Sequence, residues 1–109
     1  MLIDFDVIEE IEHIGFKGGE GVFAVRGSGD TACKIMRSRL VPGASLGWHV
    51  HEDSCEVIYV FSGQGVVRLE QGEEALVPGS CHYCPKGAGH QLINNGEEDL
   101  VILAIVPQQ

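Results

Sequence analysis

Two histidines separated by one residue, with a glutamate five positions later, constrain this chain more than any other feature. His49, His51 and Glu56 lie in the stretch from Gly43 to Gly63. If the segment around the histidines is extended, the two-residue period of a strand places both imidazoles on the same face. The residues between His51 and Glu56 are sufficient to reverse the chain and bring a carboxylate from the next strand. The pattern therefore predicts paired strands on which two imidazoles and one carboxylate converge.

A second stretch adds another imidazole. Pro85 and Gly87 indicate a turn between two strands, and the strand after the turn carries His90. Imidazole and carboxylate together form a ligand set that suits divalent transition metals. We therefore predict that four side chains bind one such ion: His49, His51, Glu56 and His90.

Written as patterns, the two stretches resemble the two sequence motifs of the cupin superfamily. The first motif is matched by Gly43, His49, His51, Glu56 and Gly63, and the second by Gly79, Pro85, Gly87, His90 and Asn94. Fifteen residues, Gln64 to Pro78, separate the motifs, which is similar to the spacing in small microbial single-domain cupins. The resemblance covers about the C-terminal two thirds of the chain. It implies a jelly-roll β-barrel, or double-stranded β-helix, with a metal held inside by three histidines and one glutamate.

The distribution of glycine agrees with an all-β fold. The 15 glycines of the 109-residue chain are spread along its whole length, as expected for short strands joined by tight turns. A chain of this length favours one compact domain. We expect a single domain over residues 1–109, with the barrel core at about 31–106 and an N-terminal edge segment at 1–30.

Charge and composition limit the kinds of partner that the protein can have. Seven basic against 16 acidic residues give a formal charge of −9, so a phosphate backbone would be repelled and nucleic acid is not an expected partner. The acidic N-terminus differs from a secretory signal, and no apolar run is long enough to span a membrane. These features predict a soluble, cytoplasmic protein with no membrane partner. Four cysteines without a secretion signal fit a reducing compartment.

The spacing of Cys81 and Cys84 allows a redox pair or half of a zinc site, but strand geometry argues against both. Residues three apart in a strand point to opposite faces, so a shared disulfide or metal would require a turn. On the strand interpretation, His82 and Cys84 point inward together. His82 is then a candidate to support the metal site from behind its ligands.

The inward face of residues 31–41 is ambiguous by apolar count. Burying the unpaired guanidinium groups of Arg37 and Arg39 would cost on the order of several kcal/mol, which favours the opposite face. The alternative, an inward arginine that binds an anionic substrate, stays open. Strand parity then predicts a narrow, largely apolar pocket lined by Met36, Ser38, Leu40, Ile58, Val60, His82 and Leu92.

The strand expected over residues 56–61 is apolar on both faces. An antiparallel strand that is covered on one side only should alternate with polar residues, so a second layer is expected. We predict a homodimer that uses a face carrying Trp48, Val57, Tyr59 and Phe61, because twofold pairing is a common way to cover such a patch. The N-terminal segment is an alternative cover.

Four protein ligands on a metal that accepts six leave two positions for a substrate. The first hypothesis is a metal-dependent enzyme, of dioxygenase or oxalate type, that acts on a small oxygen-rich or carboxylate compound. The alternative is a non-catalytic module in which the metal anchors a small-molecule ligand. A metal-free, isomerase-type barrel or a storage role would follow only if metal is absent.

Two observations bear on the choice. Leu46 stands where oxalate decarboxylases of the resembled family place a substrate-binding arginine, and the motifs supply no separate acid or base. We expect iron or manganese as the metal, with nickel, zinc, cobalt or copper as alternatives, because supply in the cell often overrides the affinity order. The ligand should chelate through two oxygens and so fill both open positions.

Overall fold

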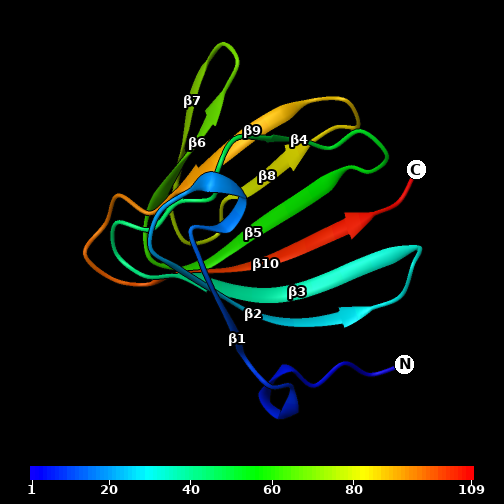
Figure 1. Ribbon diagram of the computed structural model, residues 1–109. Helices are drawn as coiled ribbons and strands as arrows, with labels where there is room; N and C mark the ends of the chain where they lie inside the picture. Colours follow the sequence, from blue (N-terminus) through cyan, green and yellow to red (C-terminus); the bar gives the residue numbers. More distant parts are fainter.

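The computed structural model describes residues 1–109 and is built from ten strands and two short 3-10 turns (Figure 1). The elements are η1 (Phe5–Val7), β1 (Ile11–Ile14), η2 (Phe16–Gly18), β2 (Val22–Gly29), β3 (Cys33–Leu40), β4 (His49–Val50), β5 (Glu56–Ser62), β6 (Gly65–Leu69), β7 (Gly72–Leu76), β8 (Cys81–Cys84), β9 (Gly89–Ile93) and β10 (Leu100–Pro107). The strands form two antiparallel sheets, and the predicted all-β jelly-roll barrel is confirmed.

The larger sheet has the strand order β1-β2-β3-β10-β5-β8. Strand β10 lies between β3 and β5, as expected for its nearly continuous apolar sequence. Every second β10 side chain is buried between the sheets: Leu100, Ile102, Ala104 and Val106. The core therefore follows the two-residue strand period, with the buried side of each strand facing the barrel interior.

The smaller sheet has the order β4-β9-β6-β7. The β6–β7 hairpin projects away from the rest of the barrel (Figure 1). Strand β4 contains only two residues, His49 and Val50, so it is shorter than the extended segment expected around the two histidines. The reason lies at Gly47, whose N–H donates to the carbonyl oxygen of Phe16 in η2 at 2.9 Å. The backbone N–H of Gly47 thus bonds to the N-terminal segment and not to a neighbouring strand, and β4 begins only after it.

The glycines of the sequence motifs occupy turns that other residues rarely adopt. Gly43, Gly63, Gly79 and Gly87 all have φ between 81° and 90°, in the left-handed region that glycine tolerates best. Asn94 is also a turn residue. Its buried amide donates to the carbonyl oxygens of Leu40 and Glu98, both at 2.8 Å. Much of the motif pattern therefore specifies turns, with the ligands held between them.

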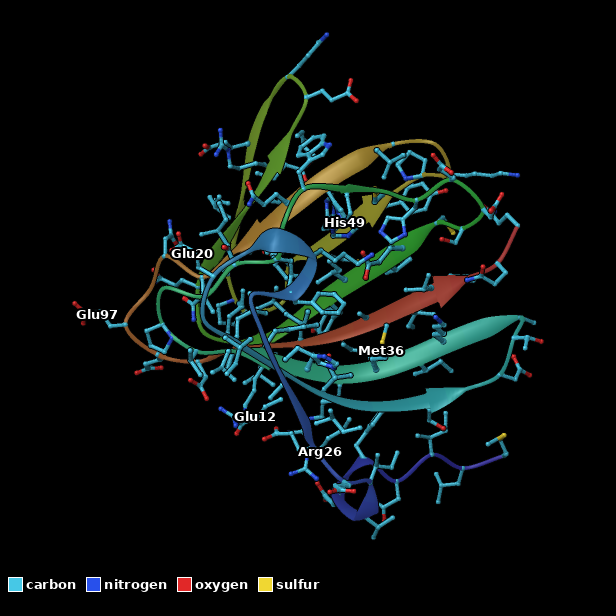
Figure 2. The ribbon with its side chains drawn as sticks, in the orientation of Figure 1. Glu12, Glu20, Arg26, Met36, His49 and Glu97 are labelled. Atoms are coloured by element: carbon cyan, nitrogen blue, oxygen red, sulfur yellow. The ribbon has the colours of Figure 1, made fainter.

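The N-terminal segment packs on the outside of the larger sheet. Arg26 donates to the carbonyl oxygen of Ile8 at 2.6 Å, and Arg39 forms a hydrogen-bonded ion pair with Glu10 at 2.7 Å. Figure 2 shows Arg26 directed toward this segment and Met36 on the neighbouring strand β3. The outward placement of the arginines is confirmed, and the opposite face of β3 buries Ser38 and Leu40.

None of the helical turns has the length and apolar character needed to cross a membrane.

Candidate metal centre

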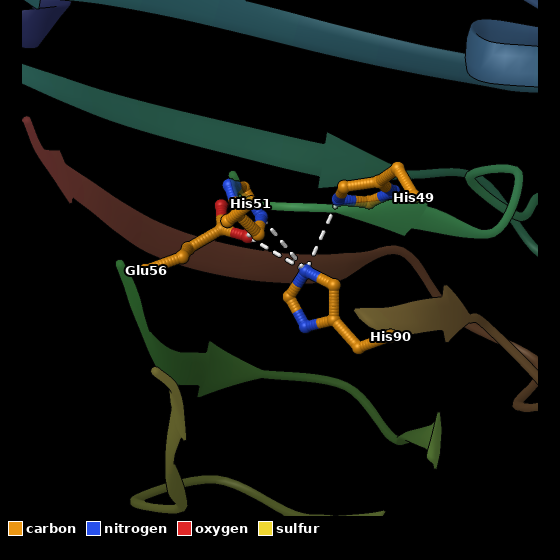
Figure 3. Close-up of side chains that lie close together, drawn as sticks. All are labelled: His49, His51, Glu56 and His90. Atoms are coloured by element: carbon orange, nitrogen blue, oxygen red, sulfur yellow. Dashed lines mark hydrogen bonds and ion pairs between the residues drawn. The ribbon is translucent and has the colours of Figure 1, made fainter. Parts of the chain in front are cut away.

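Three strands and one loop bring the four predicted ligands together (Figure 3). His49 lies on β4 directly opposite His90 on β9, His51 follows β4, and Glu56 begins β5. The cluster thus joins the two sheets, since β4 and β9 belong to the smaller sheet and β5 to the larger one. The loop between His51 and Glu56 makes the reversal that the sequence predicts.

The donor atoms are spaced as ligands of one ion would be. His90 Nε2 lies 2.9 Å from Glu56 Oε1, 3.1 Å from His49 Nε2 and 3.1 Å from His51 Nε2. His51 Nε2 is 3.0 Å from the same Glu56 oxygen. Donors about 2.1 Å from an ion and at right angles to each other are about 3.0 Å apart, the spacing of neighbouring octahedral ligands. The residues present therefore fit a divalent transition metal.

Each histidine directs Nε2 into the cluster and Nδ1 toward a polar group outside it. His49 Nδ1 donates to the carbonyl oxygen of Gly47 at 2.8 Å. His51 Nδ1 lies 3.2 Å from Ser54 Oγ, and His90 Nδ1 lies 3.0 Å from His82 Nε2. Such partners orient ligating imidazoles and hold the ring proton away from the metal.

The cluster also favours the protonation states that bind metal. Burial opposes the charge on Glu56, but hydrogen bonds from His51 and His90 outweigh burial and lower the pKa of Glu56 to about 2. Burial lowers the pKa of His49 to about 4, and the positive charge of Lys17 acts in the same direction. At neutral pH the site therefore offers a carboxylate and, at His49, a neutral imidazole.

The low pKa of His49 predicts an acid-sensitive metal-free protein. An unfolded histidine titrates near 6.5, so the unfolded state takes up this proton first as the pH falls. Stability from neutral His49 is fully present above about 6.5 and is lost as the pH falls toward about 4. We expect a loss on the order of 1–2 kcal/mol, after allowing for solvent screening of a partly exposed ring.

Urea unfolding with chelator present, at several pH values across this window, measures the effect. His49→Gln removes the titrating group and should flatten the dependence by that amount. If the free energy of unfolding changed with pH equally in the wild type and in His49→Gln, the acid sensitivity could not be assigned to His49.

A cavity of about 450 Å³ opens beside the ligand cluster. Three of the side chains predicted to line a pocket lie on its wall: Met36, Ile58 and Leu92. Leu46, which stands where the resembled oxalate decarboxylases place a substrate-binding arginine, is on the wall as well.

Four other predicted lining residues lie elsewhere. Ser38, Leu40 and Val60 are buried two to four residues further along their strands than Met36 and Ile58. At about 3.3 Å per residue, this displacement removes them from the cavity although their inward parity is as predicted. His82 contacts the rear of His90, outside the cavity.

The N-terminal segment completes the cavity, which sequence reasoning did not anticipate. His13, Phe16 and Lys17 line it, together with Lys34 from β3. The segment was predicted only as an edge element. The turn signal at residues 17–21 marks a bend, but nothing local to it indicates which surface the bend covers.

The backbone holds Lys17 in an unusual conformation at this wall. Lys17 has φ 54° and is the one non-glycine residue in the left-handed region, where such strain costs on the order of 1 kcal/mol or more. A Cβ added at Gly47 would lie 1.7 Å from the carbonyl oxygen of Lys17. Close packing against Gly47 therefore fixes η2, and with it Lys17, beside the cavity.

The cysteines form no disulfide. Cys81 is exposed and Cys84 is buried, so the two point to opposite faces of β8 as predicted. Cys84, His82 and His90 also lie close enough to form a second group of possible metal donors. This group shares His90 with the first cluster, but none of its three residues lines the cavity.

Fold and site together define a class: a small jelly-roll barrel with a cluster of three histidines and one glutamate beside an internal cavity. A family model for the cupin domain matches residues 36–106. The chain belongs to the cupin family. Both motifs identified in the sequence fall within this match.

Two curated relatives are similar over part of their length. An oxalate-binding protein of Thermotoga maritima is 33% identical over 72 residues, which is 66% of this chain and 60% of that protein. A glucose-6-phosphate isomerase of Thermococcus onnurineus is 31% identical over 65 residues, 55% of this chain and 34% of that protein. The matches thus span less than two thirds of either relative.

Solved structures are similar over the whole chain. A predicted oxalate decarboxylase of Thermotoga maritima superimposes with a TM-score of 0.93 at 25% identity, covering 100% of both chains. A sugar phosphate isomerase of the cupin superfamily from Silicibacter pomeroyi gives a TM-score of 0.82 at 26% identity, covering 100% of this chain and 76% of that one.

Proposed function

We propose that this protein binds one divalent transition metal through His49, His51, Glu56 and His90, and that the metal holds a small carboxylate ligand through two oxygens. The observation that carries the proposal is the cluster of four donor atoms, in which the His90 nitrogen lies 2.9 to 3.1 Å from each of the other three, with His49, His51 and Glu56 on the wall of a cavity. Four ligands leave two positions on a six-coordinate ion. We expect iron or manganese first, then nickel, zinc, cobalt or copper.

The cavity walls support a small anionic ligand. Lys17 and Lys34 line the cavity, while the acidic residues Glu52 and Asp53 lie on the wall next to the ligand loop. Much of the remaining wall is apolar, which strengthens the attraction between the metal and an anion by lowering the local dielectric. The positive charge of Lys17 also contributes to the lowered pKa of His49, one of the proposed ligands.

Arginine does not provide this positive charge. Arg39 is engaged with Glu10 and Arg37 lies near Asp6, both on the outer face of the sheet and away from the cavity. This placement argues against the alternative of an inward arginine that binds the substrate. Recognition of the carboxylate is therefore assigned to the metal, assisted by Lys17.

The metal cluster and the cavity would serve a protein that only binds its ligand as well as an enzyme that converts it. Binding is the part that the geometry supports most directly, and the relatives described as oxalate-binding and as a predicted oxalate decarboxylase represent the two possibilities. One observation favours turnover of the dioxygenase or oxalate type: His13, on β1, places an imidazole on the cavity wall that is not a ligand. It is a candidate for proton transfer that the motifs alone do not reveal.

Calorimetry with oxalate and acetate tests the ligand class. On metal-loaded protein, oxalate should bind at least about tenfold more tightly than acetate, a difference of about 1.4 kcal/mol, because only oxalate can fill both open positions. Lys17→Ala should weaken oxalate binding without changing the metal content. Lys86→Ala, a change at an exposed lysine outside this cavity, is the matched control.

Equal affinities for the two acids, or oxalate binding that survives removal of the metal, would contradict the proposal. Titration with a sugar phosphate in parallel separates the carboxylate assignment from the isomerase similarity. Oxygen uptake and carbon dioxide release during incubation with oxalate then distinguish turnover from binding.

The outer face of the larger sheet supports a second proposal, a homodimer. Tyr59, Phe61 and Tyr83 are 40%, 47% and 58% exposed there, next to the partly exposed Leu103 and Ile105 of β10. The N-terminal segment contacts β2 and β3 but makes no described hydrogen bond or ion pair with β5 or β8. A second copy, with the same apolar face, is the cover that we propose.

The prediction that Trp48 shares this face is wrong. Trp48 precedes β4 and packs its ring beside Gly89 of β9, in the smaller sheet. A Cβ added at Gly89 would lie 2.6 Å from that ring, so only glycine fits there. The proposed interface therefore contains Val57, Tyr59 and Phe61 without Trp48.

A further inference from the structure

A chain of hydrogen bonds leads from the rear of His90 to the protein surface. His82 Nε2 lies 3.0 Å from His90 Nδ1, and His82 Nδ1 donates to Glu74 Oε1 at 2.7 Å. The other two ligating histidines have shorter connections, to Gly47 and Ser54. Only His90 is supported by a second imidazole and a carboxylate in series.

The chain is built across the two sheets. Glu74 lies on β7, His82 on β8 and His90 on β9, so the larger sheet supplies the middle member and the smaller sheet the two ends. The side chain of His82 is 2% exposed and that of His90 is 1% exposed, whereas Glu74 is 52% exposed. Both imidazoles are therefore held in place, and the carboxylate keeps its charge in contact with water.

The direction of these bonds decides which His90 nitrogen is free. The carboxylate of Glu74 accepts only, so the bonded Nδ1 of His82 carries a proton, and when the ring is neutral its Nε2 accepts. His90 then donates from Nδ1 and leaves the Nε2 lone pair facing the ligand cluster. Glu56, 2.9 Å from His90 Nε2, favours the opposite tautomer in which that nitrogen carries the proton.

We propose that Glu74 and His82 are positioning residues that hold His90 in the tautomer able to bind metal. This inference rests on the proposed metal site. It adds the support that His90 receives from behind, on the side away from the cavity. By holding the proton of His90 on Nδ1, the pair opposes the effect of Glu56 and lowers the free-energy cost of keeping Nε2 unprotonated. The negative charge of Glu74 also makes His90 Nε2 a stronger metal ligand. Partners of this kind typically contribute 10- to 100-fold to metal affinity.

A matched pair of substitutions at His82 tests the inference. His82→Leu removes the acceptor, and metal affinity measured by competition with a chromophoric chelator should fall 10- to 100-fold. His82→Gln can place its amide oxygen near the former Nε2 and should recover most of the affinity. Thermal unfolding of both metal-free variants checks that the buried substitution leaves the barrel folded.

Glu74 provides an independent variant in case changes at His82 disturb folding. Glu74→Ala removes a half-exposed carboxylate and should weaken metal binding several-fold. Glu73→Ala on the same strand removes a similarly exposed carboxylate, 59% against 52%, whose distance from Arg68 is 4.0 Å. It should leave the affinity unchanged.

Nuclear magnetic resonance of the zinc-loaded protein supplies a readout that general loss of stability would not move. The ring proton on His90 Nδ1 should give a downfield, slowly exchanging signal in the wild type, weakened or lost in His82→Leu. Wild-type affinity in both His82→Leu and Glu74→Ala would overturn the inference, as would a second metal equivalent bound at His82 and Cys84. Failure of the wild type to bind any metal would instead refute the proposed function.

Discussion

Replacing His51 with alanine is expected to remove nearly all bound metal. His51 Nε2 lies 3.0 Å from Glu56 and 3.1 Å from His90, so it belongs to the centre of the donor set. Since the loss of a supporting partner alone costs 10- to 100-fold in affinity, loss of a ligand should cost more than about 100-fold. The metal-free barrel should remain folded, because His51 lies outside the apolar core. Elemental analysis of the purified variant measures the result.

The control is His13→Ala. His13 also lines the cavity, but it is not part of the donor cluster, so this variant should keep one equivalent of metal. One equivalent in His51→Ala would refute the assignment of His51. Loss of metal from both variants would point to a general effect on the cavity.

Placing a charge on the apolar outer face of β5 is expected to convert a dimer into a monomer. Tyr59 and Phe61 are neighbours on this face, with ring centroids 5.5 Å apart, and a twofold interface would bury each of them twice. Phe61→Glu would then bury two carboxylates per dimer. Arg37, whose guanidinium lies 5.9 Å from the centroid of the Phe61 ring, offsets part of their desolvation, so we expect a net cost of about 3 kcal/mol or more. That corresponds to a loss of association of roughly 100-fold or more.

Light scattering at micromolar concentration distinguishes the two states. Val77→Glu, at a similarly exposed apolar residue outside this patch, should leave the dimer intact. A monomeric mass for the wild-type protein would reject the dimer, and a dimeric mass for Phe61→Glu would place its interface elsewhere.

The barrel and the donor cluster could be predicted because both depend on local rules. Strand parity puts His49 and His51 on one face, and the motif glycines mark turns that require a left-handed backbone, as at Gly63 and Gly87. Parity divides the side chains of β3 into two faces, and the free-energy cost of burying arginine then decides which of them points inward. These inferences need only neighbouring residues.

Other parts of the site depend on contacts between distant segments. The cavity wall at His13 and Lys17 exists because η2 packs against Gly47, some thirty residues away, and no periodicity signals that contact. The bond from His82 to Glu74 requires the β6–β7 hairpin to lie beside β8. Parity alone assigned Ser38 and Leu40 to the pocket, because it gives the face of a strand but not the depth along it.

The error at Trp48 has the same origin. Trp48 and Tyr59 are both partly exposed, but Trp48 packs against β9 of the smaller sheet whereas Tyr59 lies on β5 of the larger one. Sequence separates the inside of a barrel from its outside more readily than it separates one sheet from the other.

Metal analysis of the wild-type protein, purified without chelator, tests the central claim most directly. The four clustered donors predict about one equivalent of a divalent transition metal per chain, with iron or manganese expected before nickel or zinc. A protein that remains metal-free even after incubation with each of these ions, while its barrel is folded, would contradict the account.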